Sequence, residues 1–509
     1  MGYSLIVRGK IMSNEKRYRP LQSEVFGHRF KANQSFYEYI LEFLIVVFSE
    51  KKIDGKYSKE LFPLGINVNS GIEYRVKNKA GLKRFIFFEK SKLEGRFNLD
   101  KIAYEYHLEL LKDEIEIEDD LTYLNKELAV KLIQDLLYGF SAVLENRSWF
   151  AQSMLPICNH TLMPEIMGTK SKRNGDYDVN DDDFKKKVDS AFQTNRYNFM
   201  ARGGEVYYLH ILSALNNHPE YKMEIEKGFN LLINQFEEVE RLCKYIQKTW
   251  INKAEIDEST TLINKTLGYI PCGFRRREEK TLVELINILN SQMHPFEKIE
   301  TLANGIIIQI MIMCYEQARN VVGKERGYLI FDINCYKGNS NEEIKKISAI
   351  NYQQYEQDLL NALYEKVNEF KNIDKSGKEK NERDTIKEAI DDSIKVYKKL
   401  GKRIGIIRPM NEKSIRFTLN EEILKYLVVA LVKPNTKMTF DRFLDKLYLN
   451  YGIIIGNEQL SRIDKKYSNI DLSYLEINKK DLQGMLKDSG FLRELSDSTS
   501  IVENPYMEV

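Results

Sequence analysis

The sequence predicts a mainly α-helical, multi-domain protein, and three observations support this fold class. The chain has 509 residues, more than a single hydrophobic core usually organises. Only 10 prolines and 27 glycines interrupt it, which favours long helices over many short strands. Apolar residues recur at helical intervals through the middle of the chain. We predict an N-terminal α+β region with a β-hairpin (1–120), a central helical body (121–370), a charged linker (371–403) and a winged-helix-like module (404–509).

The overall charge is balanced, with 77 basic and 75 acidic residues and a net charge of +2. Such a chain has no global attraction to nucleic acid or to a membrane surface, so an anion-binding surface must be a local patch. The apolar runs Tyr39–Phe48 and Gly305–Tyr315 are shorter than the roughly 20 residues that span a bilayer. We expect both runs to be buried helices, and we expect no membrane contact.

Cysteine usage indicates a reducing compartment. The five cysteines are odd in number and widely spaced, without a C-x-x-C pair, so buried reduced thiols are favoured over a disulfide framework. The N-terminus, Met1–Lys10, lacks the sustained apolar core of a signal peptide. We therefore expect a cytoplasmic protein.

The N-terminal region combines a helix with two β-like runs. Ser35 and Glu38 have the spacing of a capping box within a helix predicted over 24–48. The runs Ile72–Val76 and Arg84–Phe88 flank a loop with turn chemistry, which predicts a hairpin. A helix is expected from Leu99 to Leu111.

The helical body has the clearest periodicity of the chain. A long helix is predicted over Leu121–Leu144, weakened at Gly139. Apolar residues then follow a helical period from Phe229 to Ile246, which predicts a buried face. Further helices are expected over Thr281–Leu289 and Ile299–Val322.

The last segment suggests a small module beyond the charged linker. A strand is predicted at Ile415–Leu419 and a short buried strand at Gly452–Gly456. Asn420 and Thr439 are expected to cap two helices. With a late helix and a closing strand at Ser498–Val502, this order suits a winged-helix-like module, which can contact DNA or protein.

Strong catalytic motifs are missing from the sequence. It contains no phosphate-binding G-x-x-x-x-G-K-[ST], no H-E-x-x-H and no G-x-S-x-G. The acidic run Asp176–Asp183 begins like a calcium loop, but it has Asp181 where glycine is needed and Lys187 where glutamate is needed. Cys158 and His160, with Cys272 elsewhere, lack zinc-finger spacing, so a packed thiol and a surface histidine are favoured. We expect no metal and no cofactor.

One distinctive segment contains Arg202, Gly203, Gly204 and Glu205. Paired glycines before a helix, beside an arginine, suit an anion site at free backbone N–H groups. The alternative is a corner between two elements, in which the glycines serve a turn. The sequence favours the corner.

Two groups of basic residues are candidates for nucleic-acid contact. Arg275, Arg276 and Arg277 form the densest basic cluster, next to Phe274, which could stack on a base. Two glutamates follow directly, so a neutralised helix start is equally consistent. Lys479 and Lys480 begin the last predicted helix.

These observations lead to two functional hypotheses. We expect a non-enzymatic subunit of an intracellular multi-protein assembly that contacts partner proteins or nucleic acid, and the Lys/Ile/Asn-rich composition is compatible with a bacterial phage-defence system. The alternative is a divalent-metal-dependent nuclease near the N-terminal hairpin, so the sequence leaves enzymatic activity open. Its candidate residues are carboxylates, which could hold Mg²⁺, and lysines, which could help to orient water: Glu73, Lys77, Glu89, Lys90, Asp332 and Lys337.

Overall fold

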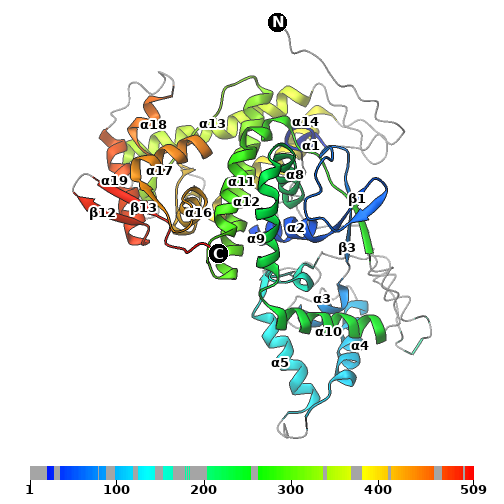
Figure 1. Cartoon of the computed structure of the whole chain (residues 1–509). Coiled ribbons are helices and arrows are strands. Elements are labelled where there is room, and N and C mark those ends of the chain that lie inside the picture. Colours follow the sequence, from blue (N-terminus) through cyan, green and yellow to red (C-terminus); the bar gives the residue numbers. More distant parts are fainter. Residues whose placement is uncertain are drawn as a thin grey trace.

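The computed structural model describes residues 20–27, 35–77, 79–87, 98–118, 124–143, 153–163, 178, 180–181, 183, 203–253, 262–335, 341–367, 381–410, 414–463, 473–496 and 499–509. Within these residues the protein is mostly helical with small sheets, which confirms the mainly α prediction. Helices α8 (Gly203–Asn217), α11 (Glu278–Leu289) and α12 (Pro295–Val321) lie at the centre of the molecule (Figure 1).

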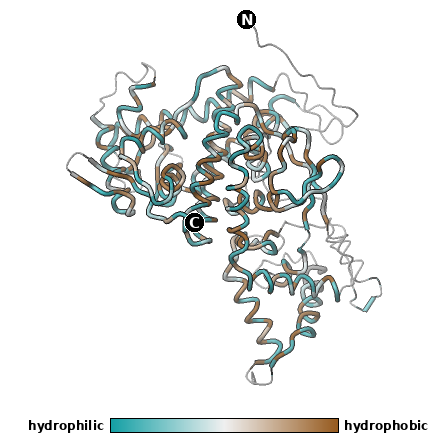
Figure 2. Tube along the Cα trace, in the orientation of Figure 1, coloured by the Kyte–Doolittle hydropathy of each residue, from teal (hydrophilic) through white to brown (hydrophobic). Residues whose placement is uncertain are grey.

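Helix α12 is the main core element. Every residue of its apolar run Gly305–Tyr315 is buried, as the sequence predicts, and hydrophobic residues follow the central helices in Figure 2. By length and composition α12 could cross a membrane, but 94% of its most apolar stretch is buried inside the protein. It is therefore read as the core helix of a globular protein.

Two helices near the N-terminus pack on this core: α1 (Leu21–Phe26) and α2 (Phe36–Phe48). The start of α2 confirms the predicted use of Glu38, whose carboxylate accepts the backbone N–H of Ser35 at 2.5 Å. Helix α2 then packs against α8 and α12, which buries both of its sides.

The N-terminal sheet has four antiparallel strands in the order β2 (Lys56–Ser58), β1 (Glu50–Ile53), β3 (Glu73–Lys77) and β6 (Leu262–Thr266). Strands β1 and β2 form a hairpin through Asp54 and Gly55, with φ values of 48° and 82°. An Asp-Gly pair with both residues at positive φ is a type I′ signal that the sequence displays and the prediction did not use.

The predicted hairpin over 72–88 is wrong in its second half. The first run forms β3, but the second belongs to the helix α3 (Ala80–Phe87). Leu82 and Phe85, three residues apart, are both buried, and the position of a Cβ on Gly81 would lie 2.5 Å from Trp250 Cβ. The packing of α3 on a distant helix thus decides its conformation.

Helix α3 belongs to a group that projects at the lower end of Figure 1, together with α4 (Asn98–Glu114), α5 (Lys126–Tyr138) and α10 (Glu237–Lys253). The predicted helix over 121–144 is shorter in the structure. It begins where the Asn125 side chain accepts the N–H of Leu128 at 2.8 Å, and it ends at Gly139. A two-stranded sheet follows, β4 (Ser141–Val143) with β5 (Ser153–Met154).

The periodic face from Phe229 to Ile246 is divided between two helices, because three residues separate the end of α9 (Lys222–Ile233) from the start of α10. Most of the face is buried as predicted, but Tyr245 is exposed. The apolar period continues across the break because both helices bury an apolar face against the core.

The helices α13 (Glu342–Val367), α14 (Glu382–Asp391) and α15 (Ile394–Ile404) complete the body. Helices α14 and α15 contain most of the residues that the structure describes within the predicted charged linker (371–403). They bury apolar residues, among them Tyr397, whose hydroxyl donates to the Cys314 thiol at 3.2 Å.

The C-terminal segment contains helices α16 (Glu421–Leu431), α17 (Phe440–Lys446), α18 (Asn457–Ser461) and α19 (Ser473–Asp488), and a π-helical turn, η7 (Leu447–Tyr451). The predicted caps are confirmed: Asn420 accepts the N–H of Ile423 at 2.9 Å, and Thr439 that of Arg442 at 3.3 Å. Strands β10 (Lys437–Thr439), β13 (Thr499–Glu503) and β12 (Leu492–Ser496) form one antiparallel sheet in that order.

This segment shares its core with the body. Helix α16 packs on α11 and α12. The short strand β11 (Ile453–Ile454) pairs in parallel with β7 (Leu329–Ile330). The remaining pair of strands is β8 (Ile407–Arg408) with β9 (Arg416–Phe417).

Candidate functional site

The three predicted arginines lie in the short 3₁₀ helix η5 (Cys272–Arg277), but they do not share one surface. Arg275 and Arg276 are exposed, and Arg276 donates to the Asn320 side chain at 3.3 Å. Arg277 is only 1% exposed, and Phe274 is fully buried. Phe274 therefore has no face to offer a base, and two arginines rather than three remain on the surface.

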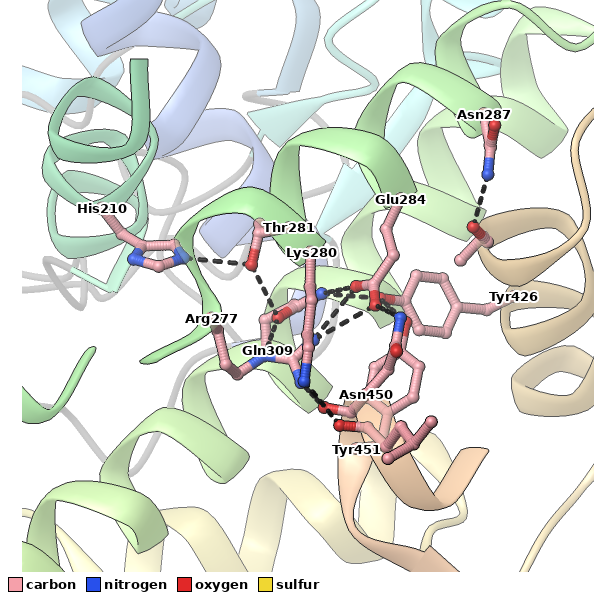
Figure 3. Close-up of polar contacts among 12 residues, drawn as sticks. His210, Arg277, Lys280, Thr281, Glu284, Asn287, Gln309, Tyr426, Asn450 and Tyr451 are labelled. Carbon is pink, nitrogen blue, oxygen red and sulfur yellow. Dashed lines mark hydrogen bonds and ion pairs between the residues drawn. The ribbon is translucent and has the colours of Figure 1, made fainter. Parts of the chain in front are cut away.

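Arg277 is the centre of a buried polar cluster (Figure 3). Its guanidinium forms an ion pair of 3.1 Å with Glu284, which is also buried. Its Nε donates to Gln309 Oε1 at 2.9 Å, another nitrogen donates to the Asn450 carbonyl, and the group lies 4.8 Å from the centre of the Tyr451 ring. Burial opposes the charge, but Glu284 together with the smaller contributions of Tyr451 and Glu316 outweighs it and raises the pKa of Arg277.

Glu284 and Gln309 extend the cluster to the C-terminal segment. Gln309 Nε2 donates to Glu284 at 2.5 Å and to the Tyr426 hydroxyl at 3.1 Å. The Asn450 side chain donates to Glu284 at 2.9 Å, and the Tyr451 hydroxyl donates to Tyr426 at 3.0 Å. The Arg277 cluster, which comprises Arg277, Glu284, Gln309, Tyr426, Asn450 and Tyr451, thus joins η5, α11 and α12 to α16 and η7.

A histidine ends the cluster on the side of α8. His210 Nε2 lies 3.1 Å from Thr281 Oγ1, and that hydroxyl lies 3.4 Å from Gln309 Oε1. Burial, with a smaller contribution from the Arg277 charge, lowers the pKa of His210 to about 3. The ring is therefore neutral at physiological pH.

A second set of cations surrounds the end of η7. Lys280 donates to the Leu449 carbonyl at 2.6 Å, and Arg326 donates to the carbonyls of Leu449 and Asn450 at 2.7 and 3.0 Å. Carbonyls at a helix C-terminus attract positive charge. Burial, reinforced by neighbouring cations, lowers the pKa of both Lys280 and Arg326.

The chemistry available to the Arg277 cluster is limited by space. A cavity lined by Tyr207, Glu284, Gln309 and Tyr426 has a volume of about 10 Å³, which is room for one water molecule. Each charge is matched within the cluster. The arrangement can therefore hold five segments in one geometry, and it offers no space for a substrate in this conformation.

Gly203 and Gly204 are the first residues of α8, and the residues directly before them lie outside the described part of the chain, so the corner stays a prediction. A Cβ on Gly203 would lie 2.2 Å from the Tyr39 ring, and one on Gly204 would lie 2.4 Å from the backbone nitrogen of Phe43. The Gly204 N–H donates to the buried Glu42 carboxylate at 2.8 Å, so the protein's own anion occupies the start of α8.

Of the other two residues predicted for this segment, the structure describes only Glu205. Glu205 accepts the Tyr74 hydroxyl at 2.7 Å, which ties α8 to the N-terminal sheet. Arg202 lies outside the described residues.

The two lysines predicted for nucleic-acid contact differ in availability. Lys479 pairs with Asp441 at 2.8 Å and lies 4.0 Å from Glu458. Its pKa is raised because these charges outweigh partial burial. Lys480 is exposed to solvent.

The residues of the nuclease alternative do not come together where they are described. Glu73 pairs with Lys52 at 3.0 Å on the N-terminal sheet, and Asp332 pairs with Arg416 at 2.6 Å in the body. Glu89, Lys90 and Lys337 lie outside the described residues. Among the residues that the structure places, no group of three or more His, Cys, Asp or Glu side chains could hold a metal ion.

Sequence reasoning missed Glu284 and Gln309, although a signal exists for Gln309. It is a polar residue within the run Ile306–Met313, and a polar group in a buried helix needs a partner. Comparison of the chain with known protein families and with curated proteins finds no match.

Proposed function

We propose that the chain is a non-enzymatic cytoplasmic subunit of a multi-protein assembly and contacts other chains through one face of α5. The observation that carries this proposal is a stripe of leucines spaced four residues apart. Leu128, Leu132 and Leu136 are 39%, 54% and 55% exposed. Residues at this spacing lie on one helix face, and a contiguous exposed apolar face is typical of an interaction site.

The occupant that we propose for this face is α5 of a second copy. The exposed residues beside the stripe have opposite charges, Lys131 and Asp135. If two α5 helices pack antiparallel about Leu132, each Leu128 meets a Leu136 of the other copy, and each Lys131 approaches an Asp135. Such a contact is self-complementary about a two-fold axis and resembles the pairing of antiparallel coiled coils.

The test is the mass of the purified full chain over a range of concentrations, measured by light scattering after size-exclusion chromatography. We expect a concentration-dependent dimer that Leu132→Asp abolishes. Leu495→Asp is the matched control, because this leucine is 65% exposed on β12, away from α5. A wild-type protein that stays monomeric at every concentration would refute self-association.

The charges of Lys131 and Asp135 test whether the chain bound to this face is an antiparallel second copy of α5. Lys131→Asp and Asp135→Lys should each weaken the dimer by placing like charges together, and the double exchange should restore it. If both single variants dimerise like the wild type, the antiparallel pairing is wrong.

Contact with nucleic acid and a winged-helix-like module remain parts of the proposal. Arg275, Arg276 and Lys480 are exposed basic residues, and the sheet β10-β13-β12 accompanies α17 and α19 as strands accompany helices in winged modules. The contacts of α16 and β11 with the body predict that protease cleavage at Lys375–Lys380 leaves the C-terminal fragment bound. A folded fragment that elutes alone would instead indicate an independent domain.

A further inference from the structure

Three cations converge on the last carbonyls of η7. Lys280 Nζ and an Arg326 nitrogen donate to the same Leu449 carbonyl, at 2.6 and 2.7 Å. Arg326 also donates to the Asn450 carbonyl at 3.0 Å, and the buried Arg277 donates to that carbonyl as well. Lys280 is seen at this junction in Figure 3. A helix end carries only about half a negative charge, so these carbonyls do not balance three cations.

Carboxylates balance two of the three cations. Arg277 is paired with Glu284, and Arg326 Nε lies 3.4 Å from Glu316. Among the residues that the structure describes, no carboxylate lies within ion-pair distance of Lys280, whose hydrogen bond goes to a carbonyl. Burial lowers the pKa of Lys280, and the charges of Arg326 and Arg277 lower it further. An anion bound at this point would offset that repulsion.

Donors remain for an acceptor outside the protein. An ammonium group has three N–H bonds, and the Leu449 carbonyl uses one of those of Lys280. Lys280 is partly exposed, and the Arg326 side chain is 26% exposed. Arg276, four residues before Lys280, is exposed and is held beside α12 by Asn320 at 3.3 Å. Three basic side chains therefore reach the surface at the end of α12.

Two stacked tyrosines adjoin these cations. Tyr328 follows Arg326 by two residues, and Tyr448 precedes Leu449; their ring centres are 5.3 Å apart with an interplanar angle of 4°. Tyr448 is buried, whereas Tyr328 is partly exposed. Proteins that bind single strands place aromatic rings for base stacking beside groups that bind phosphate. The rings favour a nucleic acid over an acidic peptide, because an acidic peptide would engage the cations alone.

We propose that this surface binds single-stranded nucleic acid. We call it the η7 patch, and its members are Arg276, Lys280, Arg326 and Tyr328. Its cations contact backbone phosphates, and Tyr328 stacks on a base. The exposed residues Glu279 and Glu325 are its acidic neighbours along the chain, and they keep the attraction local. The inference rests on the nucleic-acid contact of the proposed function, and it adds the chemistry of the strand and three residues outside the predicted arginine cluster.

The salt dependence of binding tests the cations. The probe is a fluorescein-labelled oligothymidylate, titrated with the full chain at several salt concentrations and followed by anisotropy. Lys280→Met should reduce the magnitude of the slope of log affinity against log salt by about 0.7, the value for one phosphate contact to a single strand. Lys244→Met is the matched control, because Lys244 is exposed on α10 in the lower group of helices; its slope should equal that of the wild type.

The affinity of a tyrosine variant tests the stacking. Tyr328→Leu should weaken binding about tenfold at every salt concentration, which is the size of one base-stacking contact, and it should leave the slope unchanged. Tyr364→Leu is the matched control, because Tyr364 is 49% exposed on α13. Equal affinities of Tyr328→Leu and the wild type would overturn the assignment to a single strand.

The outcomes separate this inference from the proposed function. If the wild type binds the oligothymidylate and Lys280→Met has the same slope, the η7 patch is wrong and nucleic-acid contact elsewhere stands. If the wild type does not bind it at low salt, both are wrong. Neither result bears on the α5 face, which is tested by the mass of the chain. A labelled oligoglutamate that binds in place of the oligothymidylate, and does so through Lys280, would overturn the proposal in favour of an acidic peptide.

Discussion

The Arg277 cluster predicts a large loss of stability when one of its charges is removed. In Arg277→Met the buried Glu284 carboxylate loses its ion pair of 3.1 Å, and Gln309 Oε1 and the Asn450 carbonyl lose a donor. Removing one partner of a buried ion pair lowers the free energy of unfolding by about 3–5 kcal/mol. We expect a loss of this size in the free energy of unfolding.

A double-mutant cycle separates this cost from the loss of packing. Arg277→Met with Glu284→Leu removes both charges, so no unpaired ion is left in the core. The double variant should therefore be more stable than the sum of the single losses implies, by about 1–3 kcal/mol of coupling. Arg275→Met is the surface control, and its urea midpoint should match that of the wild type.

The assay is urea unfolding followed by circular dichroism, with agreement between two probes as the check on a single transition. If Arg277→Met costs no more than a typical exposed ion pair, under about 1 kcal/mol, the cluster does not join the segments in solution. Additive single losses would show that Arg277 and Glu284 act independently.

Three further predictions concern other described residues. His210 has a folded pKa of about 3, below its ordinary value of about 6.5, so between these two pH values only the unfolded chain protonates this histidine. The free energy of unfolding should therefore fall as the pH drops through this window, by up to about 1.4 kcal/mol per pH unit. In the same urea series, His210→Gln should lose less stability over this window than the wild type. Gly204→Ala should lower the thermal midpoint strongly, because its Cβ would meet the backbone of α2 at 2.4 Å, whereas Gly484→Ala, in open space on α19, should raise it slightly; equal midpoints would remove the steric argument. If single-stranded DNA binds, replacing Arg275 and Arg276 by alanine should reduce the slope of log affinity against log salt by about 1.4, the value for two lost phosphate contacts, and an unchanged slope would mean that neither residue contacts phosphate.

The sequence by itself determined the local elements whose signals lie within a few residues. Helix caps at Ser35, Asn420 and Thr439 were predictable because the capping group and the N–H groups that it serves are neighbours. The burial of the apolar run Gly305–Tyr315 in α12 was predictable because a helix segment that is apolar on every side gains free energy when all of its sides are removed from water. The Asp54–Gly55 turn was equally legible and was overlooked.

The tertiary structure decided which residues meet across long stretches of chain. The β-like run Arg84–Phe88 is helical as far as the structure describes it, to Phe87, because Leu82 and Phe85 are buried and Trp250 of α10 lies against Gly81. No local pattern encodes the position of a partner more than a hundred residues away.

The same limit applies to the candidate site. Arg275, Arg276 and Arg277 are chemically equivalent in the sequence, and only the position of Glu284 on the next helix and of Asn450 beyond it makes one of them a buried core residue. Likewise, His160 and Glu240 meet only where η2 (Asn159–Thr161) packs on α10. Burial and pairing are properties of the folded arrangement, because the free energy of a charge or a thiol depends on the groups that surround it.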